Sequence, residues 1–150
     1  MKLSEETMHE VVVEFRRHQP LFVLTHSFFD PYNPDHPAAS NLTLQARVSA
    51  QALGYPGEGN ALGAPPVFLF EPHQPEQCDF KPQVLLDITP VWERKRQAMA
   101  SMEAQTHLVE YYTDLAKRRG VQAVRNGGSK SIQYAEAFQR VYPQVTDELK

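Results

Sequence analysis

Two adjacent stretches decide what fold this chain forms: Leu-Phe-Val-Leu-Thr-His at residues 21–26 and Asp-Pro-Tyr-Asn-Pro-Asp-His at residues 30–36. The first is an apolar run of strand length, and the second is a polar loop rich in proline. A strand that is apolar on both faces is typical of a parallel sheet covered by helices. In such sheets ligands bind beyond the carboxyl ends of the strands, so the loop after residue 26 is a candidate site.

Helical patterns lie on both sides of this strand. Ser4 is placed to cap a first helix, which Pro20 stops. A second helix is expected to begin at Pro37, with Asp35 or His36 as its cap. The strand at 21–26 therefore lies between two helices in the chain.

The rest of the chain continues this alternation. Buried strands are expected at residues 66–70 and 84–88, and Thr89 opens a long helix that Gly120 ends. Residues 134–141 predict a short terminal helix. This order of elements predicts an α/β fold with a Rossmann-like, partly parallel sheet flanked by helices.

Composition places the chain among soluble globular proteins. Its 150 residues predict a single domain, 1–150, and 41% of them are hydrophobic. A formal net charge of −3 argues against nucleic-acid binding, and no apolar run is long enough for a membrane helix. Cys78 is the only cysteine, which is compatible with a reducing compartment, and we expect a cytoplasmic protein.

Four polar side chains near the end of the first strand are candidates for a site. His36 is placed at a helix N-terminus, where the helix dipole favours the neutral imidazole that binds metals. Asp35 can orient a neighbouring ligand, Asn33 can donate to a developing oxyanion, and His26 can face the same crevice. The structural alternatives are a helix start for His36, a helix cap for Asp35, a turn residue for Asn33 and a core position for His26, which is the commoner place for a histidine there.

A second candidate constellation is Glu-Pro-His-Gln-Pro-Glu-Gln at residues 71–77, directly after the second apolar strand. Glu71 and His73 are suited to proton transfer, and Gln74 lies in the same loop. The alternative is a polar loop stiffened by its two prolines. Arg125 belongs to a glycine-containing stretch without the phosphate-loop pattern, but it can supply charge to an anionic substrate.

These residues resemble the later part of the LmbE-like, or PIG-L, zinc-dependent enzymes. Proteins of this family carry an N-terminal His-Pro-Asp-Asp element that supplies two zinc ligands and a catalytic aspartate. A later His-Pro-Asp-His element supplies the third ligand. Asn-Pro-Asp-His at residues 33–36 resembles the later element, with His36 on the ligand. The resemblance implies that this chain is an incomplete, C-terminal part of the LmbE-like fold.

Within the family, residues 30–33 and 70–77 look most like hydratases that add water to an oxo-tricarboxylate such as 4-oxalomesaconate in bacterial aromatic-acid breakdown. The resemblance implies a metal-dependent hydro-lyase with zinc bound by His36 and a small anionic carboxylate as substrate. The implied catalytic residues are Asn33, Asp35, Glu71 and His73. The implied substrate contacts are Asp30, His26, Gln74 and Arg125.

The sequence departs from the family's pattern in two places. Asn33 stands where many deacetylases of the family have a histidine, and asparagine does not exchange protons near neutral pH. No His-Pro-Asp-Asp occurs in the 150 residues, which leaves one of three protein ligands. We therefore expect the chain alone to be inactive and to associate with a missing N-terminal half or with further copies of itself. An N-deacetylase and a non-catalytic docking module are the alternatives.

Overall fold

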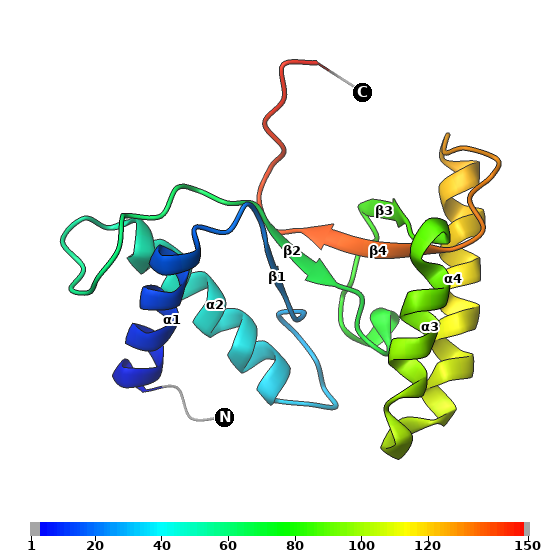
Figure 1. Cartoon of the computed structure of the whole chain (residues 1–150), viewed down its shortest axis with the longest axis horizontal. Helices are drawn as coiled ribbons and strands as arrows, with labels where there is room; N and C mark the ends of the chain where they lie inside the picture. Colours follow the sequence, from blue (N-terminus) through cyan, green and yellow to red (C-terminus); the bar gives the residue numbers. More distant parts are fainter. Residues whose placement is uncertain (1–3, 149–150) are drawn as a thin grey trace. The chain divides into compact units, whose positions relative to one another are not determined.

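The computed structural model describes residues 4–148, which form a mixed α/β fold as predicted (Figure 1). Its contacts divide into two compact units, residues 4–81 with 139–148 and residues 82–138. In chain order the elements are α1 (Glu5–His18), β1 (Val23–Thr25), α2 (Asp35–Gln51), β2 (Val67–Phe70), η1 (Pro75–Gln77), β3 (Val84–Asp87), η2 (Thr89–Val91), α3 (Trp92–Ala100), η3 (Glu103–Gln105), α4 (His107–Arg125) and β4 (Ala135–Arg140). No helix within residues 4–148 is both long and apolar enough to cross a membrane.

In the first unit β1 and β2 are parallel, as predicted, with Val23 opposite Val67 and Thr25 opposite Leu69. Helix α2 connects the two strands and packs against α1 (Figure 1). Its first residue is Asp35, two residues before the predicted start at Pro37. The core between the helices consists of Val12, Ala46, Ala50 and Leu62.

The N-terminal cap of α1 is the predicted one, because the Ser4 hydroxyl accepts a hydrogen bond from the Thr7 amide at 3.1 Å. Near the other end of α1, Arg16 is buried, with 5% of its surface exposed. Its guanidinium donates to four backbone carbonyls at the end of α2 and in the following loop: those of Ala50, Ala52, Tyr55 and Gly57. Arg16 therefore fixes this loop against α1.

The prediction that the first strand is buried on both faces is wrong for the described residues. Val23 and Thr25 are buried, but Leu24 between them is 48% exposed. Leu21 and Phe22, which precede the strand, are 88% and 55% exposed. One apolar face of β1 is thus left uncovered by residues 4–148.

In the second unit β3 and β4 pair antiparallel, so the sheet elements of the chain are partly parallel, as predicted. The predicted terminal helix at 134–141 is wrong, because β4 occupies most of it. Its burial alternates, with Ala135 and Ala137 inside, and this period of two belongs to a strand.

The predicted single long helix after Thr89 is also wrong, since α3 ends at Ala100 and α4 begins at His107. Gly120 does not end α4, which runs on to Arg125. It serves close packing instead: a Cβ at Gly120 would lie 2.3 Å from the carbonyl oxygen of Gln133. The glycine that suggested a helix end is therefore a contact point between α4 and the chain before β4.

We expect Arg16→Met to lower the free energy of unfolding by about 3 kcal/mol, because it removes a buried cation that satisfies four carbonyls. Urea denaturation measures the change. Arg17→Met is the matched control on the same helix, and its exposed side chain predicts a change within about 0.5 kcal/mol. Equal effects of the two substitutions would contradict a structural role for Arg16.

Candidate functional site

The two predicted constellations begin at the same edge of the parallel strand pair. His26 directly follows β1, and the ring of Phe70, the last residue of β2, lies edge-on to it with centroids 4.6 Å apart. The loop that starts at Glu71 therefore leaves the sheet beside the end of β1. This is the edge at which parallel sheets bind ligands.

At this edge His36 is held by side chains on both of its ring nitrogens. Nδ1 lies 2.7 Å from Oδ2 of Asp30, and Nε2 lies 3.1 Å from the amide nitrogen of Asn33. A carboxylate only accepts and an amide nitrogen only donates, so Nδ1 carries the proton and Nε2 accepts. The pair Asp30–His36 thus fixes the imidazole in the tautomer with an unprotonated Nε2, whose lone pair accepts from Asn33 and would have to give up that hydrogen bond to bind a metal.

The Asp30 carboxylate is itself fixed by the loop. Its side chain is 8% exposed, and Oδ1 accepts from the amides of Tyr32 and Asn33 at 2.8 and 3.2 Å. Burial acts to raise the pKa of Asp30, but the hydrogen bonds from His36, Tyr32 and Asn33 hold it below its usual value. Asp30 therefore remains ionised at neutral pH.

Asp30 makes an orienting contact with His36, and the orienting role suggested for Asp35 stays a prediction. The Asp35 amide donates to the side-chain oxygen of Asn33 at 3.0 Å, and Asp35 as a residue is exposed. Asn33 thus shapes the start of α2 and also contacts His36. The predicted turn role of Asn33 is therefore present, whereas its predicted donation to an oxyanion stays a prediction.

His26 lies flat against His36, with ring centroids 4.0 Å apart and an angle of 14° between the planes. Burial lowers the pKa of His26, and a charge on His36 would lower it further, against a smaller opposite effect of Asp30. His26 is therefore neutral at pH 7. The structure brings the predicted residues His26, Asp30, Asn33 and His36 into one cluster, which we call the histidine cluster.

Ser40 was not identified from the sequence; it is a residue of α2 whose side chain contacts the backbone of the histidine cluster. Its hydroxyl lies 2.7, 3.1 and 3.0 Å from the carbonyl oxygens of His26, Ser27 and His36. This contact holds the end of β1 against the first turn of α2. A serine four residues after a helical residue commonly bonds that residue's carbonyl, but nothing in the sequence reveals the other two contacts.

The remaining predicted site residues lie on two segments. Glu71 and Gln74 are half-buried and His73 is exposed in the loop between β2 and η1. Arg125 is exposed at the end of α4, in the second unit. Their predicted roles stay predictions, whereas the placement of Glu71 directly after β2 is the expected one.

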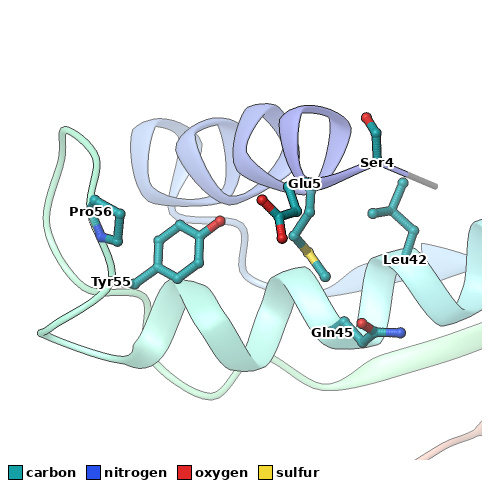
Figure 2. A pocket seen from close by; sticks show the side chains of 7 residues that line it. Ser4, Glu5, Leu42, Gln45, Tyr55 and Pro56 are labelled. Atoms are coloured by element: carbon teal, nitrogen blue, oxygen red, sulfur yellow. The ribbon is translucent and has the colours of Figure 1, made fainter.

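A separate groove lies between α1 and α2 and has a volume of about 480 Å³ (Figure 2). Its lining contains none of the predicted site residues and consists of Ser4, Glu5, Met8, Leu42, Gln45, Tyr55 and Pro56. Glu5 is the only ionisable carboxylate among these side chains, so the groove lacks the paired groups that acid–base chemistry requires.

A zinc ion in a protein is bound by three or four nitrogen, oxygen or sulfur ligands. His36 fits one such position, because a carboxylate that holds Nδ1–H is the usual partner of a metal-binding imidazole. Residues 4–148 contain no group of three or more His, Cys, Asp or Glu side chains that could hold a metal ion. The histidine cluster thus offers one oriented imidazole and not a complete zinc site.

Comparison with known proteins gives matches over the whole chain. The chain is 52% identical, over 99% of its length, to 4-oxalmesaconate hydratase of Pseudomonas putida, and it spans 59% of that protein. It superposes with a TM-score of 0.95 and 50% identity on the crystal structure of GalB, the 4-carboxy-2-hydroxymuconate hydratase of Pseudomonas putida, covering 100% of this chain and 64% of that one. The chain therefore spans about three fifths of the relatives it matches. No protein-family model matches it.

Two more distant structures share the fold alone. The conserved protein TT1542 of Thermus thermophilus superposes with a TM-score of 0.73 at 23% identity, over 95% of this chain and 61% of that one. N,N'-diacetylchitobiose deacetylase of Pyrococcus horikoshii gives a TM-score of 0.59 at 20% identity, over 92% of this chain and 52% of that one. Both agree with the predicted LmbE-like fold.

We expect the thiol of Cys78 to react slowly in the folded chain. The residue is 4% exposed, and burial raises the pKa of its thiol, with further contributions from the charges of Asp30 and Asp79. Labelling with 5,5′-dithiobis(2-nitrobenzoic acid) at pH 7.5 should be at least about 100-fold slower in buffer than in 6 M guanidinium chloride. Equal rates in both solvents would show that the chain around Cys78 is open to the reagent.

Proposed function

We propose that the chain is part of an LmbE-like protein of the 4-oxalmesaconate hydratase type, a hydro-lyase of aromatic-acid catabolism. The reaction would add water across the conjugated carbon–carbon double bond of an oxo-tricarboxylate. The observation that carries this proposal is the 52% identity over 99% of the chain, together with a superposition on a hydratase over its whole length.

The histidine cluster supplies groups that suit such a reaction. Hydration moves a proton from water to carbon and creates negative charge on the oxygen conjugated to the double bond. The neutral His26 can accept a proton, and the Asn33 amide can donate to a developing oxyanion. Glu71 and His73, on the adjacent loop, are the proposed partners in proton transfer, and Gln74 and Arg125 remain proposed substrate contacts.

We propose zinc as the cofactor of the whole enzyme, with His36 as one ligand. The other ligands would come from outside residues 4–148, since these hold no three-ligand group. Bound zinc supplies Lewis acidity and lowers the pKa of a bound water toward about 7. Asp30 would keep His36 in the tautomer that binds metal.

We further propose that this chain works in association with another polypeptide segment or with further copies of itself, in the cytoplasm. The uncovered face of β1, with Phe22 and Leu24, supports such an association, because apolar strand faces are normally buried. N-deacetylation is the alternative reaction to be tested, because a deacetylase shares the fold at 20% identity. Asn33 disfavours it, because its amide cannot exchange a proton near neutral pH.

The first test is a chimera in which this chain replaces the matched segment of the Pseudomonas putida hydratase. We expect it to hydrate 4-oxalomesaconate within about tenfold of the parent rate, because closely similar cores tolerate volume-conserving exchange. Loss of the conjugated absorbance follows hydration, and release of acetate from an N-acetyl sugar follows deacetylation. The isolated chain is the matched control and should be inactive in both assays.

Two outcomes of this test count against the proposal. A folded chimera that releases acetate but leaves the conjugated absorbance unchanged would assign deacetylation. Turnover of the oxo-tricarboxylate by the isolated chain would show that the site needs no further segment.

In the active chimera, Asp30→Asn should lower zinc affinity and kcat by about 10- to 100-fold, since it removes the charge that orients His36 but keeps the side chain's shape. Zinc content after dialysis and steady-state kinetics measure the two effects. Asp35→Asn is the matched comparison on the neighbouring exposed residue. A larger effect of Asp35→Asn than of Asp30→Asn would show that Asp35, and not Asp30, orients His36.

A further inference from the structure

One buried hydroxyl, that of Ser27 next to His26 in the chain, makes no hydrogen bond with the described residues. Ser27 is 3% exposed, and among residues 4–148 its Oγ has no hydrogen-bond partner. Two other hydroxyls in the same region are satisfied: Thr25 bonds Thr43, and Ser40 reaches three carbonyls. A buried hydroxyl without a partner destabilises the folded state, so its presence calls for a partner from outside the fold.

The backbone of Ser27 lies next to the candidate site. Its carbonyl lies 3.1 Å from the Ser40 hydroxyl, which is also 3.0 Å from the carbonyl of His36. Ser27 is therefore fixed against the first turn of α2. In the chain it lies between His26 and Asp30, both members of the histidine cluster.

We propose that the Ser27 hydroxyl is an oxygen-binding group of the active site. Its partner would be either the reacting water or a carboxylate oxygen of the substrate, and both are oxygens that a hydroxyl recognises as donor or acceptor. This inference rests on the proposed hydratase function, whose reactants are water and a polycarboxylate. It adds a residue that the sequence motifs do not contain.

The test is Ser27→Ala in the active chimera. We expect kcat/KM to fall by about tenfold or more, the loss of one hydrogen bond in the transition state. A fall in kcat with an unchanged KM identifies the reacting water as the partner. A rise in KM with an unchanged kcat identifies a substrate carboxylate. Ser27→Thr, which keeps the hydroxyl, should recover part of the activity.

Stability supplies the second readout, measured on the 150-residue chain without substrate. Ser27→Ala should leave the melting temperature unchanged or raise it, because no bond within the fold is lost. Ser40→Ala is the matched comparison and should lower it, because that hydroxyl joins β1 to α2. A loss for Ser27→Ala as large as that for Ser40→Ala would show that the hydroxyl serves the fold.

An unchanged kcat/KM for Ser27→Ala would overturn the inference while the hydratase proposal stands. A parent chimera that folds but shows no hydration would instead overturn the proposed function, and this inference with it. The two failures are distinguished by the activity of the chimera that retains Ser27.

Discussion

The parallel pairing of β1 with β2 is the constraint on which the candidate site depends. A parallel pair needs a crossover connection, and in this chain the connection is α2. The helix must begin at the edge where β1 ends, so that it can return the chain to the start of β2. His26 at the end of β1, His36 in the first turn of α2 and Glu71 after β2 are therefore brought to one edge by topology alone.

This constraint also explains how much of the site the sequence could predict. The apolar runs indicated a parallel pair, and the rule for parallel sheets indicated the edge. The contact of Asp30 with His36 could not be predicted. It depends on a turn in which the amides of Tyr32 and Asn33 hold the Asp30 carboxylate toward the imidazole, and side-chain direction in such a loop is set by tertiary contacts.

Two wrong predictions about the fold, the helix end at Gly120 and the terminal helix at 134–141, also arise from tertiary contacts. Glycine and periodicity are local signals, and at two places tertiary packing overrides them. Gly120 permits contact with the backbone of Gln133 inside a continuing helix, and β4 forms where a helix was expected because β3 offers it a partner. The burial of Arg16 likewise depends on tertiary contacts, because four backbone carbonyls accept hydrogen bonds from its guanidinium.

Charge at the histidine cluster connects its geometry with the proposed chemistry. Asp30 is ionised and His26 is neutral, so these two side chains together contribute negative charge. An oxo-tricarboxylate would be repelled by such a site unless positive charge is supplied from elsewhere. The proposed zinc ion, with ligands beyond residues 4–148, would supply that charge beside His36. Under this proposal, one arrangement would account for both the uncovered face of β1 and the single oriented imidazole: a site completed by a further polypeptide segment.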